Sequence, residues 1–377
     1  MDEPGAGGQH GSVAVTPLSF QYDGLPARVV FGAGTLARLP EEAARLQLRR
    51  VLIVSTAGQR KLADRASALL RSLSAAVFAE AAMHTPSQVT EAALALASDL
   101  RVDGFVAIGG GSAIGLSKAL ALRTDLPQLV VPTTYAGSEA TPLLGETVAG
   151  VKQTQRSPKI RPETILYDVE LTVGLPVSVS MASGLNAMAH AAEALYAPDL
   201  NPLTNLMAEA ALTALIDALP RIQARPDDLD ARTAALGGAW LSGCCLGVAT
   251  MALHHKLCHT LGGTFGLPHA QTHAILLPHA LSYNLPFAPE ALRTLARVFR
   301  HEDPARALEE LARRLGLPRA LRELGMPETA IDRAADLAVR NPYPNPRTLE
   351  REAIRGLLVR AWSGGFPRTP SVELADA

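Results

Sequence analysis

Two patterns of apolar positions divide this chain. From about Val29 to Asp168, short apolar runs rich in β-branched residues alternate with stretches of helical period. From about Val177 onward the short runs stop, and long Ala- and Leu-rich helical patterns follow one another. The first pattern predicts a parallel sheet covered by helices on both faces, and the second predicts an all-helical domain.

The individual elements follow from the same runs. In the first part we expect strands over residues 51–55, 75–79, 104–112 (ending in a glycine turn) and 129–134, and helices over about 58–72, 86–100 and 114–121. In the second part we expect helices over 178–197, 201–224 and 228–259, with shorter ones up to residue 362. The predicted fold class is therefore α/β with a parallel, Rossmann-like sheet, followed by an all-α domain.

The domain boundary is predicted near the segment Leu-Pro-Val-Ser at residues 175–178. It separates an α/β unit of residues 16–176 from a helical unit of residues 177–377. The first 15 residues are mostly Gly-rich and polar, and we expect them to form a disordered tail.

Composition narrows the class of protein. Of the 377 residues 48% are apolar and 19% are charged, as in ordinary globular proteins, and a net charge of −1 gives no field that favours nucleic acid. The three cysteines, Cys244, Cys245 and Cys258, predict no disulfide framework. The sequence shows neither a secretory signal nor an apolar stretch long enough to cross a bilayer. We therefore expect a cytoplasmic protein.

A glycine turn marks the first candidate site. Gly109, Gly110, Gly111 and Ser112 follow the third predicted strand and open the next helix. Glycines there let backbone N–H groups approach a ligand, and a helix N-terminus favours an anion such as a diphosphate. A tight turn without any ligand can have the same sequence, so this segment alone is weak evidence.

Clustered hydroxyls strengthen the case for a nucleotide. Thr133, Thr134, Ser138 and Thr141 lie at or just beyond the end of the fourth predicted strand, where open parallel sheets bind their ligands. Hydroxyls there suit a ribose, a nicotinamide amide or a diphosphate, although Ser138 can instead cap a short helix. The two segments together predict that the α/β unit binds a dinucleotide.

Ser55 and Thr56 end the first of the listed strands and are further candidate cofactor contacts. The segment 55–59 lacks the acidic residue that usually binds an adenosine 2′-hydroxyl. A 2′-phosphate is therefore not repelled, and both NADH and NADPH are candidate cofactors. Arg60 and Lys61 lie nearby, but they can equally form a solvated helix face.

Six of the ten histidines lie between residues 254 and 279. Histidine is the side chain that titrates near neutrality and is the commonest metal ligand. Any one of them can be a satisfied core residue, whereas the group indicates a site that handles protons, a metal or an anionic ligand. The roles of His254, His273 and His279 are the least clear, and His279 can simply begin a helix after a proline.

Five side chains form the candidate catalytic group. His255 and His259 are four residues apart on one predicted helix, and Asn186 and His190 have the same spacing on another. His269, expected in a loop, can complete the group. Three neutral histidines and an amide make a weak Fe²⁺ site because no carboxylate offsets the metal charge. The same side chains can bind a dianionic substrate if a histidine is protonated.

These residues lie in segments that resemble the iron-containing (group III) alcohol dehydrogenase superfamily and, within it, the maleylacetate reductases. The resemblance runs from about Phe20 to near Trp362. It is carried by FGAGTL (31–36), GGGSAIGLSKALAL (109–122), VPTTYAGSEATP (131–142), GET and KQTQ within 145–155, GLNAMAHAAEALYAPDLNP (184–202) and HHKLCHTLGGTFGLPHAQTHAILLPHALSYN (254–284).

The resemblance also bears on the metal. Metal-dependent members bind iron or zinc through one Asp and three His, and these positions correspond to Asn186, His190, His255 and His269. Asn in place of Asp is usual in the reductase branch and argues against an iron alcohol dehydrogenase. Gly115 stands where the superfamily's alcohol dehydrogenases usually carry an Asp. A bound divalent metal is left open, and we expect that none is required.

The resemblance implies reduction of the C=C bond of 2-maleylacetate to 3-oxoadipate in the degradation of aromatic compounds, with chlorinated maleylacetates as further candidate substrates. It implies a diphosphate on Gly110, Gly111 and Ser112, a nicotinamide near Thr133, Thr134 and Ser138, and Lys152 in the cofactor cleft. It also implies that His190, His255 and His269 stabilise an enolate, and that His255 or His259 delivers a proton. The implied partner is a small dicarboxylate, and the implied assembly is a homodimer with residues 20–31 as a pairing edge strand.

Three alternatives stay open at this point. One is a metal-dependent alcohol or aldehyde dehydrogenase of the same superfamily. Another is a related reductase recruited to specialised metabolism, which would keep the chemistry and change the substrate. The third is a nucleotide-binding protein that has lost catalysis.

Overall fold

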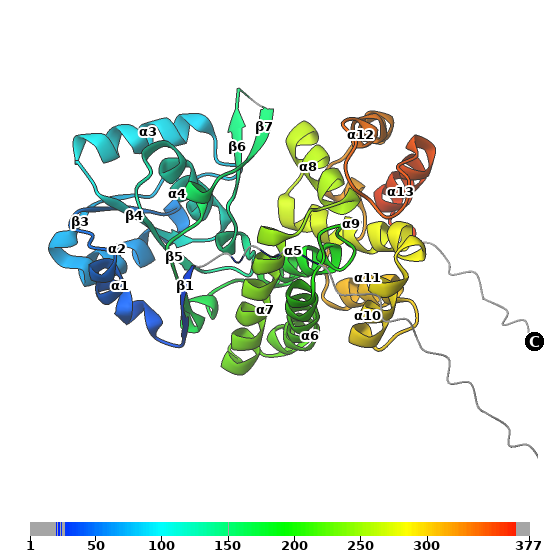
Figure 1. Ribbon diagram of the computed structural model, residues 1–377, viewed down its shortest axis with the longest axis horizontal. Coiled ribbons are helices and arrows are strands. Elements are labelled where there is room, and N and C mark those ends of the chain that lie inside the picture. Colours follow the sequence, from blue (N-terminus) through cyan, green and yellow to red (C-terminus); the bar gives the residue numbers. More distant parts are fainter. Residues whose placement is uncertain (1–19, 21, 23, 25–26, 150, 367–377) are drawn as a thin grey trace, which may run out of the picture.

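The computed structural model describes residues 20, 22, 24, 27–149 and 151–366, without the side chains of residues 151 and 152. The expected tail of residues 1–15 lies outside the described residues. Figure 1 shows two parts side by side: the strands with their helices at one end, and a body of helices at the other.

A six-stranded parallel sheet forms the core of the first part, as the apolar runs predict. Its strand order is β1-β8-β5-β4-β2-β3. The strands are β1 (Arg28–Gly32), β2 (Val51–Val54), β3 (Ser74–Phe78), β4 (Gly104–Gly109), β5 (Gln128–Pro132) and β8 (Thr164–Asp168). The order reverses between β2 and β4, and ligands bind at such reversals in open parallel sheets.

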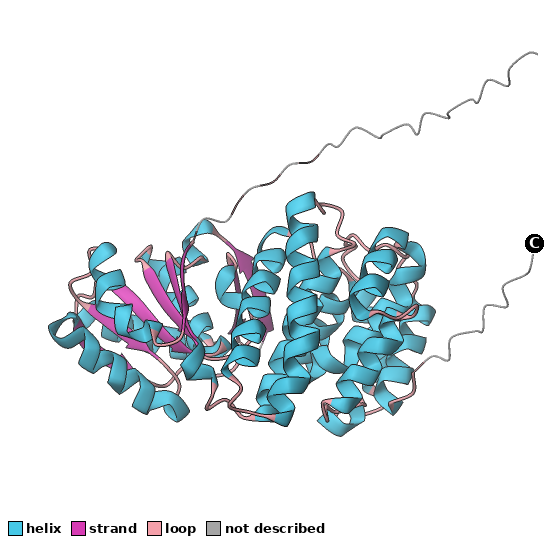
Figure 2. Cartoon of the chain, turned by 90° about the horizontal axis from the view of Figure 1, so that it is seen from below, coloured by secondary structure: helices cyan, strands magenta, loops and turns pink. Residues whose placement is uncertain are grey.

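Helices cover both faces of this sheet, because alternate residues of a strand reach opposite faces. On β4, Phe105 and Ala107 belong to a core shared with α3 and α4, whereas Val106 and Ile108 pack with α1 and α2. Figure 2 shows the strands between these helices. Their bounds are α1 (Leu39–Arg45), α2 (Arg60–Leu70), α3 (Ser87–Asp99) and α4 (Gly111–Thr124).

An antiparallel hairpin of β6 (Leu143–Val148) and β7 (Val151–Arg156) was not expected from the sequence. The end of β7, residues 153–156, is exposed and polar, so it lacks the apolar alternation that would mark a strand. The hairpin stands between the two parts of the molecule (Figure 1), and the Arg156 guanidinium donates to the carbonyl of Gly247 in the helical part.

The second part is helical throughout its described residues, as predicted. Its helices are α5 (Val177–Ala194), α6 (Pro202–Ala224), α7 (Leu229–Val248), α8 (Leu253–Phe265), α9 (His269–Asn284), α10 (Pro289–Phe299), α11 (Pro304–Arg314), α12 (Ala330–Val339) and α13 (Arg351–Ser363). Helix α5 is central: every residue from Ser180 to Ala194 is buried, against α6, α7 and α9. The predicted domain boundary precedes α5 directly, and the division into two domains stays a prediction.

The single helix expected over residues 228–259 is wrong. The chain bends by 95° between α7 and α8. Ala249 has an extended backbone, and two carboxylates outside these helices hold the break. Asp199 accepts the Thr250 N–H, and the buried Glu193 accepts the N–H groups of Ala252 and His254. The bend depends on residues more than 40 positions away, so the local pattern could not predict it.

Two expectations about α9 are also wrong. His269 is the first residue of this helix rather than part of a loop, because the chain enters the helix directly after Pro268. His279 does not begin a helix after Pro278, since α9 continues through that proline. A proline removes one hydrogen bond from a helix, and here α9 is buried on both sides of it.

Within the described part of the chain, no helix taken alone combines the length and apolar character that a bilayer-crossing segment needs. The pair α7 and α8 meets that test only when its two bent halves are taken together.

Candidate active site

The glycine turn lies where β4 meets α4, beside the point at which the strand order reverses. Gly109 has a φ of 147°, and Gly110 precedes the first residue of α4. A Cβ on Gly110 would lie 2.8 Å from Cγ2 of Thr134, so only glycine allows this close approach of the two loops. Gly111 is exposed and Ser112 is half-buried, which leaves the N-terminus of α4 accessible to an anion.

The hydroxyl-rich segment after β5 is held by a lysine that the sequence did not identify as functional. Lys118 is 2% exposed. Its Nζ donates to the carbonyl oxygens of Ser138, Thr141 and Leu143 at 2.5, 2.9 and 3.0 Å. Burial lowers the pKa of Lys118 to about 7, against an opposing effect of Glu139. The lysine therefore fixes the path of the loop that carries Ser138.

Ser138 does not cap a helix, because Gly137 precedes the short 3₁₀ turn and Ser138 is its first residue. Thr133 is buried, and its hydroxyl accepts a hydrogen bond of 2.7 Å from Nε2 of Gln59. The side chain of Gln59, which follows β2, thus contacts Thr133 after β5 and lies next to Gly109 of the glycine turn.

The two residues after β2 differ in their surroundings. Ser55 is buried, and its hydroxyl donates to the carbonyl of Ile108 at 2.8 Å, which ties β2 to β4. Thr56 is half-buried. Arg60 pairs with Asp64 at 2.8 Å on an exposed helix face. Lys152 belongs to β7, and its side chain is not among the described ones.

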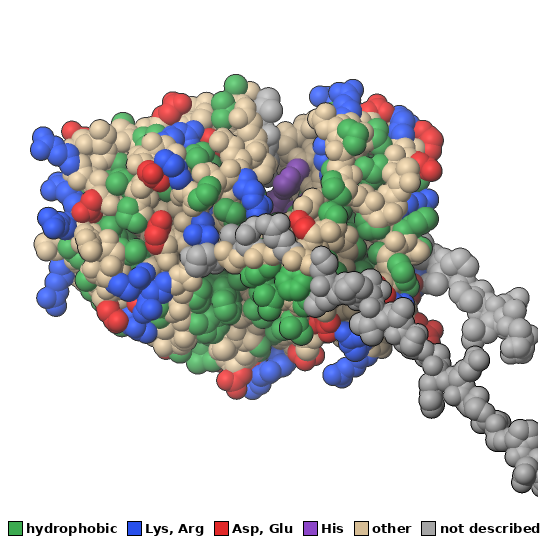
Figure 3. Space-filling model, viewed as in Figure 1, with side chains coloured by type: hydrophobic (Ala, Val, Ile, Leu, Met, Phe, Trp, Pro, Cys, Tyr) green, Lys and Arg blue, Asp and Glu red, His purple; other side chains and the backbone are tan. Residues whose placement is uncertain are grey.

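The predicted histidines converge from three helices. His190 comes from α5, His255 and His259 from α8, and His269 from the start of α9. The ring centroids of His190 and His255 are 5.1 Å apart, those of His255 and His259 are 6.2 Å apart, and those of His259 and His269 are 6.3 Å apart. Figure 3 shows histidine in a hollow between the two parts of the molecule.

Asn186 connects this histidine cluster to the hydroxyl-rich loop after β5. It lies one turn before His190 on α5, and its side-chain Nδ2 donates to the carbonyl of Ala136 at 3.5 Å. Ala136 lies between Thr134 and Ser138 in the hydroxyl-rich loop. The two predicted sites are therefore adjacent halves of one site.

Glu193 is a central residue that the sequence analysis missed. It is completely buried, and its Oε2 lies 2.5 Å from Nδ1 of His255. The same carboxylate accepts backbone N–H groups at the start of α8. Because Nδ1–H of His255 donates to Glu193, Nε2 of His255 is left to face the site. The spacing of Asn186, His190 and Glu193 on one helical face is the signal that could have identified it.

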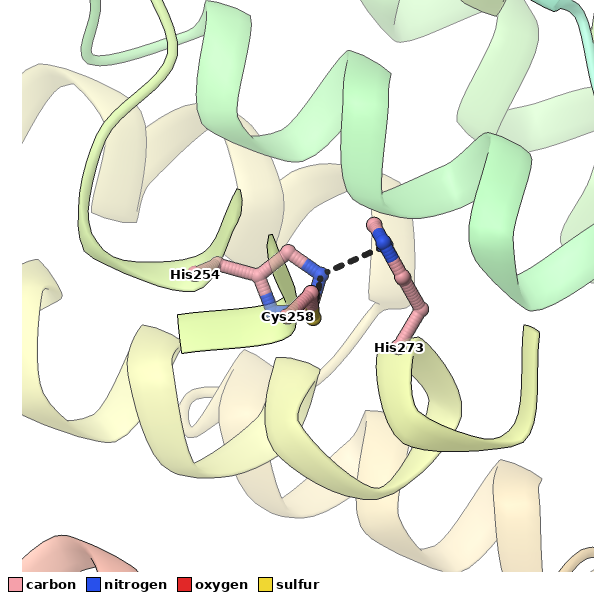
Figure 4. A group of neighbouring side chains, drawn as sticks. All are labelled: His254, Cys258 and His273. Atoms are coloured by element: carbon pink, nitrogen blue, oxygen red, sulfur yellow. Dashed lines mark hydrogen bonds between the residues drawn. The ribbon is translucent and has the colours of Figure 1, made fainter. Parts of the chain in front are cut away.

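His254, Cys258 and His273 form a second group beside the first (Figure 4). Nε2 of His254 lies 3.0 Å from Nδ1 of His273, and Sγ of Cys258 lies 3.6 Å from the same Nε2. All three are at most 1% exposed. From the sequence alone, the roles of His254 and His273 are among the least clear, and Cys258 has no predicted role in the site.

Burial keeps much of this histidine cluster neutral. The pKa values of His190, His254 and His273 lie well below the ordinary value, first because burial penalises the charged form and then because other histidines are close. The neutral form of these three rings is therefore favoured.

The residues that correspond to the family's metal ligands do not fit a resident divalent metal. Asn186 supplies a neutral amide oxygen, and the set holds no anionic donor. In the part of the chain that the structure describes, the one group of three His, Cys, Asp or Glu with ligand atoms within 4.8 Å of one another is His254, Cys258 and His273. The set of His190, His255 and His269 does not meet that distance.

Comparison with known proteins agrees with this geometry. Residues 26–169 match the family described as iron-containing alcohol dehydrogenase, and residues 180–362 match the C-terminal part of the Fe-containing alcohol dehydrogenase family. Enzymes of this family use NAD or NADP.

The similar proteins include several maleylacetate reductases. The one from Sphingobium indicum is 52% identical over 93% of this chain and 100% of its own length. The crystal structure of maleylacetate reductase from Agrobacterium tumefaciens superposes with a TM-score of 0.89 and 51% identity, covering 94% of this chain and 100% of the other. That of the Rhizobium sp. strain MTP-10005 enzyme has a TM-score of 0.88 at 51% identity over the same shares. The chain belongs to the maleylacetate reductase family of iron-containing alcohol dehydrogenases.

Proposed function

We propose that this protein reduces the C=C bond of 2-maleylacetate with NADH or NADPH, giving 3-oxoadipate. The observation that carries the proposal is the contact between Asn186 and Ala136, because it joins a nucleotide crevice to a histidine cluster that lacks the metal-binding carboxylate. The relatives of similar length and about 50% identity are maleylacetate reductases, which supports this substrate.

For the cofactor, we propose that the diphosphate binds at the N-terminus of α4, on Gly110, Gly111 and Ser112. The nicotinamide and its ribose would then lie along Thr133, Thr134 and Ser138, on the loop that Lys118 fixes. Thr56 is the candidate contact to the adenosine ribose. Ser55 holds the end of β2 in place, because its hydroxyl donates to a carbonyl of β4. Lys152 keeps its proposed place at the cofactor cleft.

For the chemistry, a nicotinamide held by Thr133, Thr134 and Ser138 would supply a hydride to one carbon of the C=C bond. The electron pair of that bond moves onto the conjugated keto oxygen as an enolate. Imidazole groups of His190, His255 and His269 would stabilise this charge. The enolate then takes a proton at the other carbon, and the keto group is restored. The sum is one hydride and one proton added across the bond.

His255 is our choice for the proton donor, with His259 as the second candidate. Oε2 of Glu193 lies 2.5 Å from Nδ1 of His255. The carboxylate would therefore stabilise an imidazolium that forms at His255 during the reaction. The dianionic substrate would bring further negative charge to a cluster in which burial lowers the pKa values of His190, His254 and His273. After the transfer, water returns a proton to the site.

We propose that no metal takes part in this reaction, because Asn186 supplies a neutral amide where metal-dependent members of the superfamily have a carboxylate. We propose a reducing, cytoplasmic compartment, because Cys244, Cys245 and Cys258 form no disulfide within the described part of the chain. For a homodimer, the support is β1, which lies at the edge of the sheet with Phe31 37% exposed. The partner ligand is a small dicarboxylate rather than a nucleic acid.

The test is NADH oxidation with 2-maleylacetate, with and without a chelator, for wild type and His255→Ala. We expect wild type to be active in both conditions and His255→Ala to lose about 10³-fold in kcat. The matched control is His301→Ala at an exposed histidine after α10, which should match wild type. Unchanged turnover by a folded His255→Ala would rule out its catalytic role.

A further inference from the structure

His273 lies within the histidine cluster, although neither the family positions nor the sequence analysis assigned it a role. It comes from α9, one turn after His269. Its ring centroid is 4.3 Å from that of His269, 5.1 Å from that of His255 and 6.3 Å from that of His190. It therefore contacts most of the side chains that we assign to the substrate.

One nitrogen of His273 is fixed and the other is available. Nδ1 lies 3.0 Å from Nε2 of His254, which also lies 3.6 Å from Sγ of Cys258 (Figure 4). Nε2 of His273 is buried and has no hydrogen-bond partner among the residues that the structure describes. A buried polar atom without a hydrogen-bond partner destabilises the folded protein unless a ligand supplies that partner.

A neutral imidazole carries one N–H, so either His254 donates to His273 or the reverse. Each arrangement leaves one buried N–H without a partner in the described part of the chain, either on Nε2 of His273 or on Nδ1 of His254. Buried N–H groups without an acceptor are rarer than acceptors without a donor. A ligand oxygen beside Nε2 of His273 therefore selects the arrangement in which His254 donates from Nε2 and His273 carries its own proton on Nε2.

His255 and His273 thus present opposite groups from neighbouring positions. Glu193 accepts the Nδ1–H of His255, so in this tautomer Nε2 of His255 carries a lone pair. With a ligand oxygen at His273, His254 donates its Nε2–H to Nδ1 of His273, so Nε2 of His273 carries a hydrogen-bond donor. His255 is backed by a carboxylate, whereas His273 is backed by a neutral imidazole and acts as a fixed donor.

We propose that His273 is a substrate-contacting residue, whose Nε2–H donates to an anionic oxygen of the unsaturated dicarboxylate, and that His254 is the positioning residue that holds this tautomer. The proposal rests on the proposed function, since it names a further contact for the same substrate. A donor aimed at an oxygen that gains charge during the reaction stabilises the transition state more than the ground state.

The test compares two amides at position 273. In His273→Asn, the side-chain oxygen can still accept from His254, but the residue is too short to present a donor at the position of Nε2. In His273→Gln, the amide N–H reaches that position. We expect kcat/KM for 2-maleylacetate to fall by about 10²-fold in His273→Asn and to recover to within about tenfold of wild type in His273→Gln. The Kd for NADH should stay within about twofold in both, because the contact is with substrate.

A second pair tests the positioning residue. His254→Gln keeps a donor toward Nδ1 of His273, and His254→Leu removes it. We expect His254→Leu to lower kcat/KM by about tenfold and His254→Gln to restore most of it. The matched control is His301→Asn, an exposed histidine outside the cluster. Melting temperature and NADH binding confirm folding in each case.

The outcomes separate the inference from the proposed function. Wild type that does not turn over 2-maleylacetate contradicts the proposed function itself. Active wild type with folded His273→Asn of equal kcat/KM overturns the role of His273. Equal loss in His273→Asn and His273→Gln overturns it too, because a donor would then not matter. A stoichiometric metal that is lost in Cys258→Ser would also overturn it, since His254 and His273 would then be ligands.

Discussion

The two halves of the site are built in different ways. The proposed nucleotide half comes mainly from residues 109–142, with Thr56 and Gln59 added after β2, and it uses backbone N–H groups, glycines and hydroxyls at the ends of β4 and β5. The histidine half gathers side chains from α5, α8 and α9 and depends on buried partners such as Glu193. A binding site made of backbone tolerates changes in distant residues, whereas a site made of buried side chains depends on every member of its network.

Among the substitutions that test this contrast, the largest loss of activity is expected at Glu193. Glu193→Gln keeps the size of the side chain but removes the charge beside His255, so we expect kcat to fall by about 10³-fold while the Kd for NADH is unchanged. Steady-state kinetics and fluorescence titration of NADH measure the two quantities. Glu209→Gln, a carboxylate on α6 that pairs with Arg297, is the matched control and should leave kcat unchanged. A similar loss of NADH binding in Glu193→Gln would show that the halves are not separate.

The acid stability of the helical part should depend on the buried His279 of α9. Burial lowers the pKa of His279 from 6.5 to about 3, so the native protein keeps this ring neutral while the unfolded chain takes up a proton below pH 6.5. Stability is therefore present above pH 6.5 and is lost as the pH falls toward 3. At pH 5 the loss from this residue is about 2 kcal/mol, for 1.5 pH units at about 1.4 kcal/mol each.

The measurement is urea unfolding of wild type and His279→Leu at pH 8 and pH 5. The free energy of unfolding should fall less between these pH values in the variant, by about 2 kcal/mol. His301→Leu, at an exposed histidine, should behave as wild type. An equal fall in wild type and His279→Leu would contradict the assignment.

A smaller effect is expected at the glycine turn. In Gly110→Ala the new Cβ would meet Thr134 at 2.8 Å, which displaces the loop from the diphosphate position. We expect KM for NADH to rise about tenfold with little change in kcat, because the histidine half is untouched. Gly174→Ala, at a glycine with nothing within 4 Å of the added Cβ, is the control. A fall in kcat without a change in KM for NADH would contradict the claim that the two halves act separately.

The smallest expected effect concerns cofactor choice. Thr56→Asp places a carboxylate at the end of β2, where it would bind an adenosine 2′-hydroxyl and repel a 2′-phosphate. We expect the ratio of kcat/KM for NADH to that for NADPH to rise about fivefold, since the position is half-exposed and screened. Thr56→Asn, with the same shape and no charge, should leave the ratio unchanged. A change of equal size in both variants would exclude an electrostatic cause.

The sequence predicted the strands and the glycine turn of the proposed nucleotide half well, because the information for them is local. The apolar runs of β2, β4 and β5 and the glycines between β4 and α4 specify both the strands and their ends. The role of Lys118 in this half was not predicted, because it depends on carbonyl groups of a loop, such as that of Thr141, more than 20 residues away. The polar hairpin of β6 and β7 was missed because it has no apolar alternation.

In the histidine half, helical spacing found Asn186, His190, His255 and His259, but not the groups that orient them. Glu193 lies in the same segment, three residues after His190, yet its contact with His255 exists only because α8 begins after a sharp bend. That bend is held by Asp199 and by Glu193 itself, across more than 50 residues. Long-range contacts of this kind cannot be read from the period of one segment.

The central claim is that the hydride goes to a carbon of the C=C bond in a site that works without a metal. The most direct measurement uses NADH carrying deuterium at the transferred position, with 2-maleylacetate and a chelator present, and locates the deuterium in the product by NMR. The account predicts 3-oxoadipate with an intact keto group and one deuterium on a methylene carbon of the former double bond. Deuterium on a carbinol carbon, or turnover that stops with chelator and returns with Fe²⁺ or Zn²⁺, would contradict it.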